Sequence, residues 1–132
     1  MTTHHAACSC GQLNLVAEGD PVRVSICHCL ACQRRTGSSY GYQARFPPAC
    51  VTVSGEAQRW TRAADSGNRI DQYFCPVCGA TVYYILRDAP DIIAVPVGAF
   101  ADPTFDSPCF SVYESRKHRW VNVPPSAESR DD

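Results

Sequence analysis

Long apolar runs are absent from this sequence: no segment approaches the ~20 consecutive apolar residues that a membrane-spanning helix needs. An apolar pattern of helical period long enough to build a helical fold is also missing. The first residues contain no basic stretch followed by an apolar one, so they do not indicate a secretory signal. We therefore expect a cytoplasmic protein with no membrane partner and little helix.

An excess of positive charge is absent as well. Lys and Arg number 12 and Asp and Glu number 13, which gives a formal net charge of −1 and a pI near 6.4. A chain without an overall basic field is not drawn onto nucleic acid or an anionic membrane. We expect no nucleic-acid partner, and the sequence leaves the oligomeric state open.

The size of the chain fits one domain. It has 132 residues, and its hydrophobic content of 45% could supply one modest core. We expect a single zinc-binding domain over residues 1–123. Residues 124–132 offer no core-forming side chains and are expected to be a flexible C-terminal tail. His4 and His5 are interpreted as a disordered leader rather than as metal ligands.

Short segments rich in β-branched and aromatic residues, separated by turn residues, predict a mostly β fold. The expected strands are residues 13–17, 22–26, 38–46, 51–53, 73–74, 81–86, 92–97 and 110–114. The first two are expected to form a hairpin, and residues 30–36 one helical turn. Pro96 indicates that its strand is an edge strand or contains a bulge.

Nine cysteines are present, an odd number for a disulfide scaffold. Tight CxC and CxxC pairs favour reduced thiolates on a metal, and knuckles of this kind are typical of zinc sites. In a CxxC turn two sulfurs converge on one tetrahedral ion, and in an extended CxC both sulfurs point to one side. Seven of the cysteines form three clusters: Cys8-Ser9-Cys10-Gly11, Cys27-His28-Cys29-Leu30-Ala31-Cys32 and Cys75-Pro76-Val77-Cys78-Gly79.

Seven ligands divide into four for a closed structural site and three for a site that keeps one position open. The division that we favour has a structural set and an open set: Cys8, Cys10, Cys75 and Cys78, and then Cys27, Cys29 and Cys32. Spacing alone leaves another grouping open, a zinc ribbon in which Cys29 and Cys32 join Cys75 and Cys78. Two zinc ions per chain are expected from the first grouping and one from the ribbon.

The open set, Cys27, Cys29 and Cys32, is the candidate catalytic site. An incoming thiol that coordinated at the fourth position would be held as thiolate, which is the nucleophilic form. The sequence identifies no acid–base residue for such a reaction.

Three arginines near the open set, Arg34, Arg35 and Arg45, are candidate ligands for the carboxylates of a glutathione-like thiol. A guanidinium presents a bidentate fork to a carboxylate. The alternative is that all three belong to a solvated surface.

The other candidate residues have simpler interpretations. His28 lies between two ligands of an extended segment, so we expect hydrogen bonding rather than metal binding. His118 could act as an acid or base, although a surface histidine is the favoured interpretation. Cys50 and Cys109 stand alone and are expected to be buried as small apolar residues.

The order of these motifs resembles the glutathione-dependent formaldehyde-activating enzyme family, which includes centromere protein V. The resemblance rests on seven cysteines that match in type, order and grouping from Cys8 to Gly79, including the segment from Ser25 to Gly37. It implies a β-tent fold of short antiparallel sheets. It also implies the same division of ligands, with a structural zinc and a catalytic-type zinc.

The activity implied by this resemblance is the condensation of glutathione with formaldehyde to S-hydroxymethylglutathione, formally a carbon–sulfur lyase reaction in reverse. Our first hypothesis is therefore a zinc-dependent enzyme of carbon–sulfur lyase type that acts on a glutathione-like thiol or its aldehyde adduct. The competing hypothesis is a non-catalytic zinc-binding module, for which the centromere-protein branch is the precedent. The sequence does not identify the physiological thiol or aldehyde.

Overall fold

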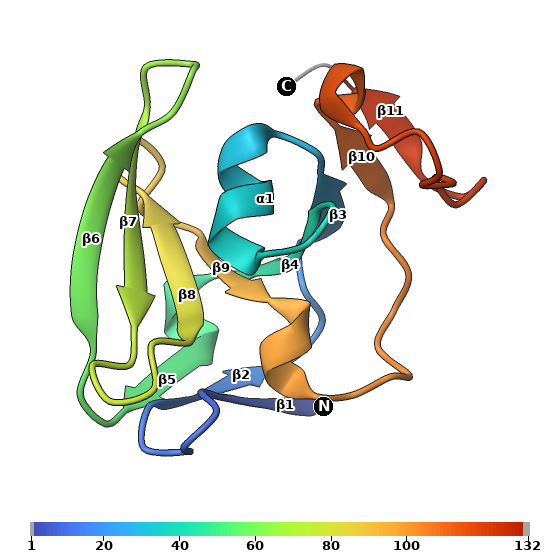
Figure 1. Cartoon of the computed structure of the whole chain (residues 1–132). Coiled ribbons are helices and arrows are strands. Elements are labelled where there is room, and N and C mark those ends of the chain that lie inside the picture. Colours follow the sequence, from blue (N-terminus) through green and yellow to red (C-terminus); the bar gives the residue numbers. More distant parts are fainter. Residues whose placement is uncertain (1, 131–132) are drawn as a thin grey trace.

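The computed structural model describes residues 2–130 and shows two β-sheets that share one core (Figure 1). The smaller sheet has the order β1-β2-β5 and is antiparallel: β1 (Thr3–Ala7), β2 (Asn14–Glu18) and β5 (Val51–Ser54). The larger sheet has the order β11-β10-β3-β4-β9-β8-β7-β6: β3 (Arg23–Cys27), β4 (Gly41–Phe46), β6 (Gln58–Ala63), β7 (Arg69–Phe74), β8 (Thr81–Leu86), β9 (Ile93–Pro96), β10 (Phe110–Val112) and β11 (Glu128–Arg130). Its neighbouring strands are antiparallel except at β10, which runs parallel to both β3 and β11.

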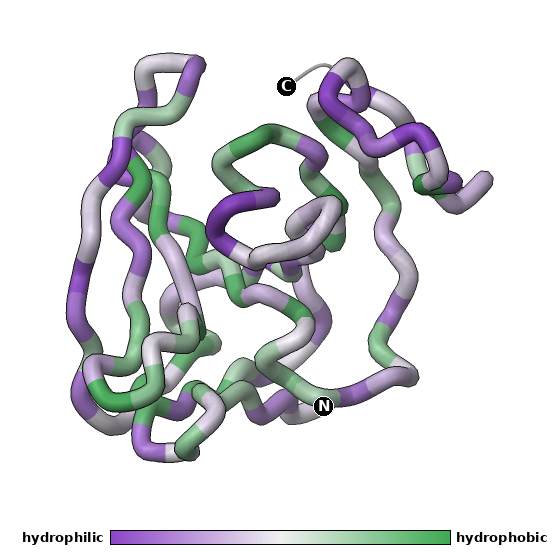
Figure 2. Tube along the Cα trace, viewed as in Figure 1, coloured by the Kyte–Doolittle hydropathy of each residue, from purple (hydrophilic) through white to green (hydrophobic). Residues whose placement is uncertain are grey.

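Helix is confined to short elements in the part of the chain that the structure describes. They are α1 (Leu30–Thr36) and three 3₁₀ turns, η1 (Pro48–Cys50), η2 (Val97–Phe100) and η3 (Glu114–Arg116). In Figure 2, α1 changes from hydrophobic at its start to hydrophilic at its end. None of these elements has the length and hydropathy that a membrane-crossing helix requires.

The core lies where the smaller sheet packs against the larger one. Leu13 and Leu15 contact a cluster that contains Phe46, Val82 and Val95, and all five side chains are 0% exposed. Burial of each such side chain stabilises the fold by roughly 1.5–3 kcal/mol. The mostly β class that the sequence predicts is confirmed, as is a helical segment at residues 30–36.

The predicted hairpin between residues 13–17 and 22–26 is wrong. These segments are β2 and β3, and they lie in different sheets: β2 pairs with β1 and β5, whereas β3 pairs with β4 and β10. The turn between them carries the chain from one sheet to the other. Turn residues between two apolar segments therefore marked a crossing between layers, which local sequence does not distinguish from a hairpin.

The two chain ends also differ from the expectation. His4 lies in β1, its Nε2 bonds the carbonyl of Gly19 at 3.1 Å, and its ring packs against Phe46 and Phe100, so the disordered leader is wrong. In the segment expected to be a flexible tail, residues 128–130 form β11 beside β10. Residues 131 and 132 of that segment lie outside the described part.

Pro96 does not place its strand at an edge of the sheet. β9 lies between β4 and β8, and Pro96 is its last residue, opposite Gln43. A proline at the end of a strand removes no hydrogen bond from the interior of the ladder. The strand is thus central, and the proline ends it.

Candidate metal clusters and the adjoining cavity

Four cysteines from two distant turns meet at one end of the molecule. Cys8 directly follows β1 and Cys10 lies in the next turn, whereas Cys75 and Cys78 lie in the turn between β7 and β8. Backbone bonds close both turns: Cys8 N–H donates to the carbonyl of Leu13 at 2.9 Å, and Cys75 N–H to that of Ala80 at 3.0 Å. Cys8 and Cys75 are buried, while Cys10 and Cys78 lie at the surface.

The spacing of these four sulfurs suits a single tetrahedral ion. The Sγ atoms all lie within 4.8 Å of one another, with Cys8 and Cys10 3.6 Å apart and Cys10 and Cys75 3.7 Å apart. Four sulfurs held about 2.3 Å from one zinc ion would be about 3.8 Å apart. The residues present therefore fit a zinc ion in type, number and approximate spacing.

Hydrogen bonds to the sulfur of Cys75 favour its thiolate. The side chain of Gln12 donates to this sulfur at 3.0 Å and the backbone N–H of Val77 at 3.3 Å. Burial raises the pKa of Cys75, but these donors and the N–H of Cys78 outweigh burial and lower that pKa to about 6. Deprotonation prepares the sulfur for a metal.

The second cluster comes from one continuous segment. Cys27 is the last residue of β3, Cys29 caps α1, and Cys32 lies in its first turn. Their three sulfurs also lie within 4.8 Å of one another. Cys27 and Cys32 are buried and Cys29 is half-buried. Among the residues of known placement, no fourth Cys, His, Asp or Glu joins this group.

Negative charge in this second cluster concentrates on Cys29. Hydrogen bonds from the thiols of Cys27 and Cys32 lower the pKa of Cys29 to about 2. Hydrogen bonds with Cys29 and Cys32, together with burial, raise the pKa of Cys27. The pKa of Cys32 is also raised, because its hydrogen bond with Cys29 and its burial outweigh the lowering by its bond with Cys27. The backbone N–H of Cys32 also donates to the Cys29 sulfur, at 3.3 Å, and so favours a thiolate there.

A cavity of about 890 Å³ opens beside the three-cysteine cluster, and all three cysteines line it. This volume is within the range of small-molecule sites. Strand register explains the composition of its floor, because paired residues of a sheet point to the same face. One row of paired residues crosses six strands from β3 to β6: Arg23, Arg45, Ala94, Tyr84, Gln72 and Trp60.

All members of that row except Ala94 line the cavity. Two further rows on the same face bring Ser25 opposite Gln43 and Cys27 opposite Gly41. Arg35 reaches from α1 onto this floor, with its guanidinium 5.0 Å from the centre of the Tyr84 ring. Gly41 leaves room for it, since a Cβ there would lie 2.8 Å from Arg35 Nη2. Burial raises the pKa of Tyr84 to about 12, so its phenol stays neutral.

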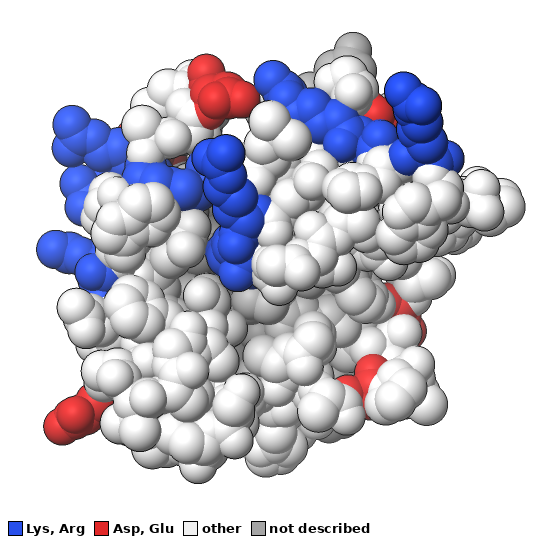
Figure 3. All heavy atoms as spheres, viewed as in Figure 1, with Lys and Arg blue, Asp and Glu red and all other residues white. Residues whose placement is uncertain are grey.

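The cavity is rich in arginine. Its described lining includes six arginines and one carboxylate, Asp65: the arginines are Arg23, Arg34, Arg35, Arg45, Arg62 and Arg116. Figure 3 shows Lys and Arg gathered toward the end of the molecule where α1, β10 and the turn after β6 lie. A chain of net charge −1 therefore concentrates positive charge around one cavity.

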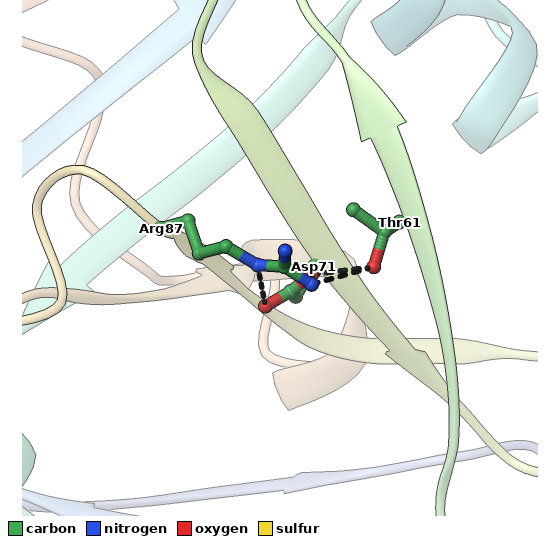
Figure 4. Close-up of polar contacts among 3 residues, drawn as sticks. All are labelled: Thr61, Asp71 and Arg87. Atoms are coloured by element: carbon green, nitrogen blue, oxygen red, sulfur yellow. Dashed lines mark hydrogen bonds and ion pairs between the residues drawn. The ribbon is translucent and has the colours of Figure 1, made fainter.

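The wall formed by β6, β7 and β8 is fixed on its opposite face by an ion pair (Figure 4). Arg87, just after β8, donates to both carboxylate oxygens of Asp71 on β7, at 3.0 and 3.2 Å. Thr61 on β6 donates to Asp71 at 2.6 Å. These bonds tie three strands together while their other face lines the cavity.

The candidate ligands and arginines from the sequence lie in the two cysteine clusters and around the cavity. The structure brings together the two cysteine sets that we favoured, and it separates Cys29 and Cys32 from Cys75 and Cys78, so the ribbon grouping is not formed. Arg34, Arg35 and Arg45 all line the cavity.

The histidines and the two lone cysteines lie outside both clusters. His28 is fully buried, and its Nε2 lies 3.0 Å from Ser111 Oγ, in accord with hydrogen bonding. His118 is exposed, contacts Gln33 at 2.9 Å and does not line the cavity. Cys50 is half-buried, whereas Cys109 is exposed, so the expected burial of Cys109 is wrong. Cys109 directly precedes β10 at the surface.

Much of the cavity floor was missed by the sequence analysis. The missed residues are Arg23, Ser25, Gln43, Arg62, Gln72 and Tyr84. A signal was present in the alternation of polar residues at 23 and 25 with the ligand at 27, which places all three on one face of a strand. Their convergence with β6–β8 depends on strand order, which this alternation does not indicate.

Fold and site together define a mostly β protein with two cysteine clusters, one of which opens onto a basic cavity. The chain matches the family described as glutathione-dependent formaldehyde-activating enzyme over residues 3–116, and it belongs to that family. The fold is similar to the crystal structure of a Rhodobacter sphaeroides protein, with a TM-score of 0.58 and 19% identity over 77% of this chain and 90% of that one. No curated protein matches the chain significantly.

Proposed function

We propose that this protein is a zinc-dependent enzyme of carbon–sulfur lyase type that acts on a glutathione-like thiol or its aldehyde adduct. The observation that carries the proposal is the three-cysteine cluster in the wall of an 890 Å³ cavity. Family membership supports the same chemistry. None of the nine cysteines, all of which lie within the described residues 2–130, forms a disulfide, so a reducing compartment such as the cytoplasm suits the protein.

Two zinc ions per chain form part of this proposal. Cys8, Cys10, Cys75 and Cys78 would hold a structural ion, and Cys27, Cys29 and Cys32 a second ion that faces the cavity. Zinc at the second set would supply Lewis acidity that keeps an incoming thiol as thiolate.

The residues of the cavity would bind and orient the substrate. In the synthetic direction the thiolate sulfur attacks formaldehyde, a carbon–sulfur bond forms, the carbonyl π bond breaks, and the oxygen takes up the proton that the thiol released. Arg35 and Arg45 would hold acidic groups of the thiol away from the reacting atoms. Cys29 is half-buried and lines the cavity, so its sulfur faces the space in which the substrate would bind.

The proposed activity is tested by NMR exchange between glutathione, formaldehyde and their adduct. Zinc-loaded protein should accelerate this exchange above the rate without protein, because positioning and thiolate formation both lower the barrier. A rate equal to that of the protein-free solution would remove this substrate assignment and favour the non-catalytic zinc module.

A pair of variants tests the division of metal roles. Cys29→Ser should lose about one zinc ion per chain and the exchange activity while the far-UV circular dichroism stays that of the folded protein. Cys78→Ser should unfold the domain, because the cluster it disrupts joins β1 to the β7–β8 turn. Equal unfolding by the two variants would contradict separate structural and catalytic roles.

A further inference from the structure

Four of the six arginines that line the cavity, Arg34, Arg35, Arg45 and Arg62, lack an acidic partner among the residues that the structure describes. Asp65 already lies 3.6 Å from Arg116, and its side chain is largely exposed. Positive charge concentrated in a concave surface attracts anions. The cavity is thus complementary to a ligand with several negative charges.

Several polar atoms on the floor of the cavity are buried without a hydrogen-bond partner, as expected of a preformed ligand site. Gln43 is 2% exposed and its Nε2 donates to Ser25 Oγ at 3.1 Å, but its Oε1 has no hydrogen-bond partner. Arg35 Nη2 and Arg45 Nε are likewise buried without a partner. Buried polar groups are nearly always hydrogen-bonded, so these atoms point to a ligand that completes them.

The floor has a reactive end and a cationic end. On β3 and β4, the cross-strand pair Cys27 and Gly41 lies at one end, and the pair Arg23 and Arg45 lies four residues away. Four residues of strand span about 13 Å. A thiol whose sulfur lies at Cys27 would therefore contact Arg45 only if it carries an acidic group about 13 Å from its sulfur.

We propose that the cavity selects extended thiols that carry carboxylate or phosphate groups at the end remote from sulfur and that lack an ammonium group. This inference names the substrate class of the proposed enzyme and rests on that function. Glutathione meets the first condition through its carboxylates and fails the second through its amino group. Its N-acyl derivatives and phosphorylated thiols meet both.

The case against an ammonium is electrostatic. An ammonium group on the floor would lie beside Arg35 and Arg45, which form no ion pair within residues 2–130, and the one carboxylate among the described lining residues is Asp65 at the rim. Burial of a cation without a counter-ion is costly. An uncharged amide N–H of the ligand, by contrast, could donate to Gln43 Oε1.

Binding to zinc-loaded protein tests the selection with three thiols: glutathione, N-acetylglutathione and 4′-phosphopantetheine. The readouts are calorimetry and the fluorescence of Trp60, which lines the cavity. N-acetylglutathione has the thiol and carboxylates of glutathione without its ammonium, so it should bind about tenfold more tightly. Tighter binding of 4′-phosphopantetheine as well would extend the class to phosphates, and binding of N-acetylglutathione alone would restrict it to carboxylates. Glutathione binding as tightly as, or more tightly than, both others would overturn the inference.

Arginine variants show where in the cavity the acidic end of the ligand binds. Arg45→Gln should weaken N-acetylglutathione about tenfold or more, and Arg34→Gln, at the exposed rim, should weaken it less. Arg69→Gln is the matched control, because Arg69 is exposed on β7 and does not line the cavity. Equal affinities of Arg45→Gln and Arg69→Gln would place the acid elsewhere and reject the model.

The two proposals can fail separately. Ten-fold preference for N-acetylglutathione without catalysed exchange would retain the anion site and remove the lyase function. Catalysed exchange with equal or tighter binding of glutathione would retain the lyase function and remove this selection.

Discussion

At the scale of single residues, Gln12 and Gly55 show how one close contact supports the four-cysteine cluster. Gln12 donates to the sulfur of Cys75 and to the carbonyl of Glu56, and accepts from the N–H of Glu56. Gly55 permits this approach: its φ is +95°, and a Cβ there would lie 1.9 Å from the carbonyl oxygen of Gln12. The cluster therefore depends on a glycine far from any ligand in the sequence.

Gly55→Ala should destabilise the protein by about 3 kcal/mol or more, because left-handed backbone strain of about 1–2 kcal/mol adds to a clash with backbone. Urea denaturation of zinc-loaded protein measures the effect. The matched control is Gly67→Ala, whose φ is +89° but whose Cβ would meet nothing within 4 Å, so it should cost about 1–2 kcal/mol. Similar losses in the two variants would show that the contact with Gln12 contributes nothing.

At the scale of elements, successive side chains of a strand point to opposite faces of the sheet, so one face of β7 lines the cavity while the other holds neighbouring strands together. On β7, Ile70 and Gln72 line the cavity, whereas Asp71 faces the other way and bonds Thr61 and Arg87. The sequence predicted only the last residues of β7, because polar residues dominate its first half. It missed β6 for the same reason: every residue of β6 is exposed or half-buried, so no apolar alternation marks it.

Asp71→Asn tests the contribution of this ion pair across pH. Hydrogen bonds from Arg87 and Thr61 lower the pKa of Asp71, so the folded state favours the carboxylate. The resulting stabilisation is present above the ordinary aspartate pKa and is lost as pH falls through the lowered pKa of the folded state. The variant should therefore have a lower urea midpoint than wild type at pH 7, and the difference should shrink below about pH 4.

Asp91→Asn provides the control for this experiment, since Asp91 is exposed and forms no ion pair within residues 2–130. Its urea midpoint at pH 7 should match that of wild type. A pH-independent gap between Asp71→Asn and wild type would indicate a packing defect instead of the loss of a charge interaction.

At the scale of the whole molecule, the sequence predicted the cysteine grouping far better than the cavity. CxC and CxxC motifs are local, so the spacing of Cys27, Cys29 and Cys32 already brings their sulfurs together on one turn and one helix start. The cavity needs the order of β3, β4, β9, β8, β7 and β6, because its floor is a row of residues that pair across these strands. Strand order follows from long-range packing, which no short motif encodes.

The two clusters also differ in how they are linked to the rest of the molecule. The four-cysteine cluster joins Cys10 and Cys75, which are 65 positions apart in the sequence, and it connects the two sheets. The three-cysteine cluster spans six residues of one segment and faces the cavity. Metal at the first constrains the chain over a long loop, whereas metal at the second constrains a segment that β3 and α1 already order.

Chelation should therefore remove the two proposed zinc ions in separate steps. A chelator enters the cavity and reaches half-buried Cys29, so the first ion should leave while the far-UV circular dichroism remains unchanged. Release of the second should coincide with loss of β-structure, because folding and metal binding are coupled at a site built from distant segments. A colorimetric zinc indicator and circular dichroism, recorded together, follow both steps. Cys29→Ser should show the second step alone, and release of both ions in one step together with unfolding would contradict the separate roles of the two clusters.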